Sequence, residues 1–367
     1  MQKVLRGREK LPQVKDMAEA MAIRHPLIIG RAQAEKLPFP DAPRFTGYHA
    51  NPAWEDCAAA VTMYRENGCD GLISIGGGSA MDTAKAVKAL LTASSPEEAL
   101  KGVDTSEGPK HIAIPTSAGT GAEATPFAVI YVNHVKHSLS HPTLLPDGVV
   151  LDSTLLATLP LYHKKSCALD ALCQGIESYW AKAATEDSRV DAYLAILGVL
   201  DNLQAYLQGD PHAEDAMLDA AYRSGKAIQV SRTTAAHAMS YGLTQNLGIA
   251  HGHACALTLP FLWEQMTHCE KMIPTLASLA EVMRLGSDLM GPKLLCGMLL
   301  DLDMTAPAMP EDAVMDRLVA TVNVERLGNH PVPLSAADIR MIYRRAFTPL
   351  RPNEAQACLD IWRYYGK

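Results

Sequence analysis

No segment of this sequence is apolar for long enough to cross a membrane as a helix. A span needs roughly 18 uninterrupted apolar residues, which no window approaches, and Met1–Lys10 carries charges where a signal peptide has its apolar core. Runs of lysine and arginine are also lacking, and the formal net charge is -7, so the sequence offers no positive patch for a phosphate backbone. We therefore expect a cytoplasmic protein with neither a nucleic acid nor a membrane as its partner.

Closely spaced cysteine pairs, which would indicate a disulfide framework or a zinc knuckle, are absent as well. The eight cysteines are scattered and have mostly apolar neighbours: Cys57, Cys69, Cys167, Cys173, Cys255, Cys269, Cys296 and Cys358. We expect reduced, mainly structural thiols. The sequence also has no internal repeat and no low-complexity segment.

The length of 367 residues, with 48% hydrophobic and 20% charged residues, predicts two globular domains. Up to about Asp152, short apolar runs alternate with helical stretches, a pattern typical of a mostly parallel sheet. After Leu159–Pro160, helical spacing dominates and clear strands disappear. We predict an α/β domain over residues 1–160 and an all-helical domain over residues 161–367.

Apolar periodicity gives the expected elements. Strands are predicted at 25–30, 71–75, 111–114, 127–132 and 149–152, and helices at 52–67 and from Ser79 onward. An amphipathic helix is predicted where apolar residues recur at three- and four-residue steps, at Leu169, Leu172, Cys173, Ile176 and Trp180. Ser335, followed three residues later by Asp338, marks a further helix start.

A run of three glycines, Gly76, Gly77 and Gly78, followed by Ser79, connects a predicted strand to a predicted helix. Glycines let the backbone approach a ligand closely, and the free N–H groups of a helix start attract anionic oxygens. The run therefore predicts a phosphate-binding loop. A plain tight turn is the alternative, because the run matches neither G-x-G-x-x-G nor a Walker loop.

A second polar loop, Pro115–Glu123, also follows a predicted strand and contains Thr116, Ser117 and Thr120. Small hydroxyl residues at strand ends are suited to a dinucleotide that lies across the edge of a sheet. Two such loops in one domain favour nucleotide binding over a purely structural turn.

Carboxylate, amide and imidazole side chains recur at helical spacing in the second half. Asp170 and Gln174 lie four residues apart on one face, His237 and Tyr241 repeat that spacing, and His251 lies at a loop or helix start. Such a set can hold a divalent transition metal. A histidine in an alanine-rich helix is more often a satisfied core or surface residue, so spacing alone does not decide.

Taken in order, four segments resemble the iron-containing (group III) alcohol dehydrogenase family: Gly76–Lys85, Pro115–Glu123, Asp170 and Ala250–His253. The resemblance runs along nearly the whole chain. It implies a dehydroquinate synthase-like architecture, with a Rossmann-like nucleotide-binding domain, a helical domain, and a metal and a nicotinamide that meet between them. It also implies a homodimer acting on a small aldehyde or alcohol.

Residue by residue, the resemblance implies that Gly77, Gly78, Ser79 and Thr116 bind the pyrophosphate, with Gly76 and Ser117 beside them, and that Asp82, Thr120 and Lys136 lie near the cofactor. The metal, Fe²⁺ or Zn²⁺, would be held by Asp170, Gln174, His237 and His251. Two positions depart from the common pattern, since Gln174 and Tyr241 stand where most or many members carry histidine. A glutamine carbonyl is a weaker donor to iron or zinc than an imidazole.

The segments Asp170–Trp180 and His251–Leu259 resemble most the branch of the family that includes phosphonoacetaldehyde reductases. This resemblance implies NADPH- or NADH-dependent reduction of an anionic two-carbon aldehyde. Lys226 and Arg232 are candidates for binding the anionic group, and Tyr241, His253 or a water chain for donating the proton. Arg31, after the strand at 25–30, favours NADPH because its guanidinium can pair with the 2′-phosphate.

Three alternatives stay open. The chain can be a general short-chain alcohol dehydrogenase, or a different enzyme on a similar scaffold, such as a dehydroquinate synthase-like cyclase or a glycerol-phosphate dehydrogenase. It can also be a metal-free nucleotide-binding relative without turnover, because Gln174 replaces an imidazole. A metal assay beside an activity screen separates these classes.

Overall fold

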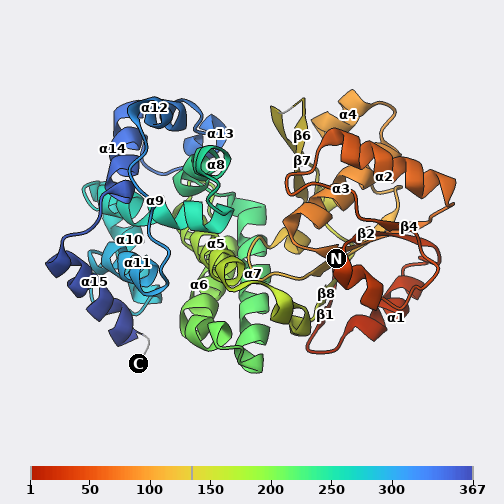
Figure 1. The fold of residues 1–367 in the computed structure, drawn as a ribbon, viewed down its shortest axis with the longest axis horizontal. Helices are drawn as coiled ribbons and strands as arrows, with labels where there is room; N and C mark the ends of the chain where they lie inside the picture. Colours follow the sequence, from red (N-terminus) through yellow and green to blue (C-terminus); the bar gives the residue numbers. More distant parts are fainter. Residues whose placement is uncertain (1, 134, 366–367) are drawn as a thin grey trace. The chain divides into compact units, whose positions relative to one another are not determined.

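Short apolar segments in the first half of the chain form a six-stranded sheet in which all neighbouring strands are parallel. The computed structural model describes residues 2–133 and 135–365 (Figure 1). The sheet order is β1-β8-β5-β4-β2-β3, and the strands are β1 (Lys3–Arg6), β2 (Pro26–Gly30), β3 (Arg44–Phe45), β4 (Gly71–Gly76), β5 (Lys110–Pro115) and β8 (Gly148–Leu151). The carboxyl ends of all six strands therefore lie at one edge.

Both faces of the four inner strands, β8, β5, β4 and β2, are buried, which explains why these strands are apolar without alternation. On one face Ile28, Ile73 and Ile112 lie in register and pack with Val14 of α1. On the other face Leu27 packs with residues of two helices. The helices of this half are α1 (Val14–Glu19), α2 (Trp54–Glu66), α3 (Gly78–Thr92) and α4 (Pro96–Lys101), with 3-10 turns at Leu11–Gln13, Ala32–Lys36, Ala122–Ala124, Pro142–Leu144 and Ser153–Thr158.

The strand predicted at 127–132 exists but belongs to a different sheet. β6 (Phe127–Val132) pairs antiparallel with β7 (Val135–Ser140), and only alternate residues of β6, Ala128 and Ile130, are fully buried. These two pack against α3 in a core cluster with Ala86 and Ala89. The strand is thus present where it was predicted, but a hairpin that covers a helix buries only one of its faces.

The chain divides into two compact units between Leu159 and Pro160. In the second unit every regular element that the structure describes is helical. They are α5 (Leu161–Trp180), α6 (Glu186–Leu207), α7 (Pro211–Ser231), α8 (Ala235–Leu247), α9 (His251–Met266), α10 (Ile273–Val282), α11 (Met290–Asp301), α12 (Asp312–Ala320), α13 (Val324–Gly328), α14 (Ala336–Phe347) and α15 (Pro352–Tyr365), with a 3-10 turn at Glu270–Met272. The expected α/β plus all-helical fold is thus confirmed.

Helix α5 is central to this unit, since it packs against α6, α7 and α9. Its crossing with α9 is close at Gly252, where an added Cβ would lie 2.0 Å from the carbonyl oxygen of Ser166 and 2.6 Å from Cβ of Asp170. Only glycine permits this approach. The contact brings the first turn of α9, which begins with His251, against the turn of α5 that carries Asp170.

The predicted helix start at Ser335 is confirmed. Its hydroxyl accepts a hydrogen bond from the backbone N–H of Asp338, and the Asp338 carboxylate accepts from the Ser335 N–H, which completes a capping box at the start of α14. None of the helices in the described ranges combines the length and the apolar character that a bilayer span requires.

Candidate metal centre and nucleotide loops

Four potential metal ligands from three helices of the second unit converge on one point. They are Asp170 on α5, His237 on α8, and His251 and Cys255 on α9. One ligand atom of each lies within 4.8 Å of the others. Three of these residues were predicted from sequence as metal ligands, and the fourth, Cys255, was not.

Two atoms that face this point have no hydrogen-bond partner among the described residues, although both are buried. They are Asp170 Oδ1 and His237 Nε2, and they lie 3.3 Å apart. His251 Nε2 lies 3.9 Å from the same carboxylate oxygen. Buried polar atoms are normally satisfied, so acceptors that converge in this way are suited to binding a cation.

The imidazole of His237 is fixed from behind by a buried carboxylate. Its Nδ1–H donates to Glu177 Oε2, which leaves the lone pair of Nε2 for a metal. Oε1 of Glu177 accepts from the backbone N–H groups of Thr234, at 3.1 Å, and Ala236, at 2.8 Å, and thereby caps the start of α8. One side chain therefore anchors both the helix and the ligand that the helix carries.

A hydroxyl fixes His251 in a similar way. Ser240 Oγ donates its hydrogen to the carbonyl of His237, at 2.9 Å, and so can only accept from Nδ1–H of His251, 3.2 Å away. Nε2 of His251 is then the unprotonated nitrogen. In their neutral forms, both histidines thus present to the cluster the lone pair that a metal needs.

The ionisable groups of the cluster stabilise one another's charged forms. Burial opposes ionisation of Asp170 and Glu177, but the polar and charged groups around them, His237 among them, outweigh it and lower the pKa of both carboxyls. Burial likewise opposes ionisation of Cys255, yet His237 and His251 lower the pKa of its thiol to about 7. The pKa of His251 is raised to about 9 against burial, mainly by Cys255 and Asp170.

Gln174, the predicted fourth ligand, lies one turn from Asp170 on α5 but is engaged elsewhere. Its Oε1 lies 2.7 Å from the hydroxyl of Ser224 on α7, which also bonds the carbonyl of Ala221 at 2.8 Å, and its amide group is hydrogen-bonded to Asp170. The carbonyl oxygen, the only atom of this side chain that can ligate a metal, is therefore turned toward α7.

Sequence reasoning missed Cys255 because its neighbours are apolar, which is typical of a structural thiol. The signal was present in its spacing, since Cys255 follows His251 by four residues and α9 places both on one face. The packing of three helices around that face could not be derived from spacing.

The two predicted proton donors have different surroundings. The ring of Tyr241 stacks on His251, with centroids 5.8 Å apart and planes 12° apart. His253 uses Nε2 to donate to the carbonyl of Met304, at 2.8 Å, and Nδ1 to accept from the hydroxyl of Tyr162, at 3.2 Å. Only Tyr241 lies directly against a member of the cluster.

The two predicted anion-binding residues also differ. Lys226 Nζ lies 2.9 Å from a carboxylate oxygen of Asp191 on α6, in an ion pair. Arg232 follows the end of α7 with φ 61° and ψ 176°, a backbone conformation that costs energy for any residue except glycine. Thr234, the N-cap of α8, lies two residues further on.

In the first unit, the glycine run connects β4 to α3, and the second polar loop follows β5, the neighbouring strand. The two loops touch, because a Cβ added at Gly77 would lie 3.6 Å from Ser117 Oγ, and one at Gly78 would lie 3.3 Å from Cγ2 of Thr120. Thr116 N–H also donates to the carbonyl of Gly76, at 3.0 Å. The predicted phosphate-binding residues are thus gathered at the carboxyl edge of the sheet.

Other predicted cofactor residues lie on the same side of this unit. Asp82 is one turn into α3 and accepts from the N–H of Val129 at 3.0 Å. Burial raises the pKa of Asp82 to about 6, against the lowering effects of Lys85 and Lys136. Arg31 follows directly on β2, where its guanidinium donates to the carbonyl of Tyr48 and lies 4.7 Å from the centre of the Tyr48 ring. Ser79 donates to the carbonyl of Ala50.

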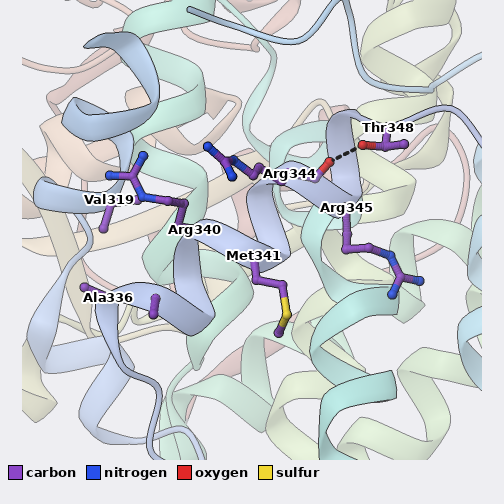
Figure 2. Close-up of a pocket in the computed structure, with 8 residues that line it drawn as sticks. Val319, Ala336, Arg340, Met341, Arg344, Arg345 and Thr348 are labelled. Carbon is purple, nitrogen blue, oxygen red and sulfur yellow. Dashed lines mark hydrogen bonds between the residues drawn. The ribbon is translucent and has the colours of Figure 1, made fainter. Parts of the chain in front are cut away.

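A surface pocket of about 520 Å³ along α14 contains none of these residues (Figure 2). Its arginines form ion pairs with carboxylates, Arg340 with Asp316 and Arg345 with Glu264. Because these pairs are largely exposed, the pocket is an ordinary charged surface.

Comparison with known proteins gives two family matches. Residues 2–153 match the iron-containing alcohol dehydrogenase family, and residues 165–293 match the C-terminal part of the Fe-containing alcohol dehydrogenase family. The long-chain-alcohol dehydrogenase 1 of Geobacillus thermodenitrificans is 30% identical over 340 residues, which cover 85% of this chain and 84% of that protein.

Two other relatives are more similar over a shorter length. The phosphonoacetaldehyde reductase of Streptomyces viridochromogenes is 39% identical over 228 residues, which cover 58% of this chain and 57% of that protein. The probable alcohol dehydrogenase EutG of Escherichia coli is 37% identical over 221 residues, covering 58% and 55%. The matched segment thus spans little more than half the length of these relatives.

Among solved structures, the iron-containing alcohol dehydrogenase of Thermotoga maritima has a TM-score of 0.82 and 26% identity, covering 94% of this chain and 98% of that one. The sulfoacetaldehyde reductase of Bifidobacterium kashiwanohense, determined with NAD+, has a TM-score of 0.83 and 23% identity, covering 95% and 97%. These similarities confirm the expected architecture.

Proposed function

The chain belongs to the iron-containing alcohol dehydrogenase family, and we propose that it reduces a small aldehyde to a primary alcohol with a nicotinamide cofactor and a divalent metal. The observation that carries this proposal is the convergence of Asp170, His237 and His251. A phosphate-binding type of loop in the first unit supports it. The combination fits hydride transfer next to a metal better than either feature does alone.

Asp170, His237 and His251 are the residues that would hold the metal, and their unsatisfied or unprotonated atoms fit that role. When bound, the metal supplies a Lewis acid that polarises the carbonyl oxygen of the aldehyde. Glu177 and Ser240 keep the two imidazoles in the required tautomer.

Reduction leaves negative charge on the former carbonyl oxygen, and a proton must reach it. We favour Tyr241 as the donor, because it stacks on His251. His253 is the weaker candidate, since both of its ring nitrogens are engaged by Tyr162 and Met304. On the cofactor side, Gly77, Gly78, Ser79 and Thr116 would bind the pyrophosphate through backbone N–H groups and hydroxyls.

For the substrate we propose phosphonoacetaldehyde, reduced to 2-hydroxyethylphosphonate. The support is the 39% identity to a phosphonoacetaldehyde reductase over 228 residues. Arg232 is our preferred residue for binding the phosphonate, because its strained backbone lies two residues before Thr234, the N-cap of the helix that carries His237.

The test is kcat/KM for phosphonoacetaldehyde and for propanal, measured with NADPH and with NADH. We expect at least a tenfold preference for the anionic aldehyde, which Arg232→Ala reduces. Arg223→Ala is the matched control, since this arginine of α7 is paired with Asp191 at 2.9 Å. Equal kcat/KM values for the two aldehydes, or a preference for propanal, would indicate a general short-chain alcohol dehydrogenase. If no aldehyde is turned over, the result would indicate a nucleotide-binding relative without activity.

A further inference from the structure

We propose that Cys255, and not Gln174, is the fourth ligand of the metal, so that one carboxylate, two imidazoles and one thiolate hold the ion. This inference rests on the proposed metal-assisted function and specifies the ligand set of that site. It replaces the set expected from sequence, in which four ligands were found by helical spacing and family resemblance.

The position of the thiol carries the first part of the argument. Sγ of Cys255 lies 4.0 Å from Nε2 of His251, one helical turn earlier on α9. Around a tetrahedral zinc ion, neighbouring ligand atoms are roughly 3.3–3.6 Å apart, given metal–ligand bonds of about 2.0–2.3 Å. The other separations are 3.3 Å for His237–Asp170 and 3.9 Å for His251–Asp170, and all four ligand atoms lie within 4.8 Å of one another, so the cluster is somewhat wider than a closed tetrahedron.

Two of the three remaining ligands give a second, independent argument. Asp170 Oδ1 and His237 Nε2 are buried and lack a hydrogen-bond partner among the described residues, yet they face the same point as the thiol. A purely structural thiol does not require two unsatisfied acceptors beside it. A cation at that point would satisfy both atoms and bind the sulfur as well.

Gln174 is poorly placed to be a ligand. Its carbonyl oxygen accepts the Ser224 hydroxyl at 2.7 Å, and its amide nitrogen, which has no lone pair for a metal, is directed to Asp170. To ligate, the amide would have to turn over and give up its hydrogen bond to Asp170, because the Ser224 hydroxyl, which also bonds the carbonyl of Ala221 at 2.8 Å, can accept from the amide as well. In its present position it orients the Asp170 carboxylate, which is the role of a positioning residue.

Coordination requires the thiolate, so the thiol proton leaves to solvent as the metal–sulfur bond forms. A divalent ion bound by two anionic ligands, Asp170 and Cys255, has no residual charge, whereas ligation by Gln174 would leave one positive charge. The thiolate also makes the site softer, which favours zinc over manganese or magnesium. Attraction for an anionic substrate would then have to come from side chains such as Arg232.

X-ray absorption of the zinc-loaded full-length protein tests the proposal without an activity assay. We expect one sulfur scatterer at about 2.3 Å in addition to nitrogen and oxygen scatterers. The cobalt-substituted protein should show a sulfur-to-cobalt charge-transfer band in the near ultraviolet. That band should disappear in Cys255→Ala and persist in Gln174→Ala.

Cys173→Ala is the matched control, because Cys173 is also a fully buried thiol, lies on α5 and is not one of the four converging residues. We expect it to keep the band. Circular dichroism of each variant checks folding, and the sulfur scatterer in wild type decides the question even if Cys255→Ala does not fold.

Zinc bound by nitrogen and oxygen alone would overturn this inference and leave the proposed function intact. So would a band that survives Cys255→Ala or is lost in Cys173→Ala. A wild-type protein that takes up no zinc or cobalt would overturn the metal site altogether, while aldehyde reduction remains a separate measurement.

Discussion

The two candidate sites of this chain are built in different ways. The nucleotide loops in the first unit consist of glycines, small hydroxyl residues and backbone groups at the edge of a parallel sheet. The metal cluster in the second unit consists of side chains from α5, α8 and α9, three of them buried, and each of its two imidazoles is oriented by another side chain. The first site depends on backbone shape and the second on the identity of single side chains.

This difference has consequences for mutation. A site built from backbone N–H groups loses ligand affinity gradually when a side chain is added to it, because several N–H groups contribute contacts to the ligand. A metal site fails when one ligand is removed, because the ion has few ligands and each is needed. The predictions below test this contrast, beginning with the largest effect.

Removing one imidazole should have the largest effect. His237→Ala should lose the metal and lower kcat/KM about 1000-fold, because Lewis-acid stabilisation of the developing charge contributes several kcal/mol. Elemental analysis and steady-state kinetics measure the two effects, and nucleotide affinity, measured by fluorescence titration, should change little. A variant that keeps its metal would show that His237 is a structural histidine.

The contrast also explains what could be predicted from sequence. The glycine run and the Ser335–Asp338 cap are local signals, and the structure has them where they were expected. Cys255 could not be assigned a role, because the cluster forms only when α5, α8 and α9 pack together.

Long-range pairing also limited the prediction of strands. β1 (Lys3–Arg6) is a short, charged, incompletely buried segment with no apolar pattern, and it becomes a strand by pairing with β8, more than a hundred residues away. The strand at 127–132 had the pattern of a buried strand, but its partner β7 is polar and exposed at several positions, so it forms a hairpin instead.

Replacing Glu177, which orients the ligand His237, should lower metal affinity less than removing the ligand itself. The carboxylate of Glu177 accepts hydrogen bonds from N–H groups of His237, Thr234 and Ala236. In Glu177→Gln, an amide nitrogen that can only donate replaces one of the two accepting oxygens. We expect metal affinity to fall roughly 10- to 100-fold. Competition with a chelator measures it.

Glu214→Gln is the control for this variant, since Glu214 is another buried glutamate of the same unit and is paired with Lys164 at 3.7 Å. It should leave metal affinity unchanged. Equal affinity losses in both variants would mean that Glu177 acts through general stability and does not orient His237.

Filling the glycine loop should weaken nucleotide binding without loss of stability. Gly77 has φ -80°, and a Cβ there meets only Ser117 Oγ at 3.6 Å, so the fold itself tolerates alanine. We expect Gly77→Ala to weaken binding of the cofactor roughly tenfold, because the methyl group occupies the space of the pyrophosphate. Gly47→Ala, whose Cβ would also make only ordinary contacts, at 3.5 Å, is the control. Unchanged cofactor affinity in Gly77→Ala would mean that the run is a plain turn.

An effect no larger than that of Gly77→Ala is expected on the choice between NADPH and NADH. Arg31 lies directly after β2, and its guanidinium is held by the carbonyl and the ring of Tyr48 while the residue stays exposed. A guanidinium fixed in this way can pair with a 2′-phosphate at little cost in entropy, so we expect wild type to prefer NADPH. Arg31→Asp should lower the ratio of kcat/KM for NADPH to that for NADH roughly tenfold, since a carboxylate repels the phosphate and can accept from the ribose hydroxyl.

Arg24→Asp is the control. It makes the same change of charge at the amino end of β2, away from the carboxyl edge, and should leave the ratio unchanged. If the ratio falls equally in both variants, the effect comes from net charge and not from a contact of Arg31. If the wild-type protein prefers NADH, Arg31 does not bind the 2′-phosphate.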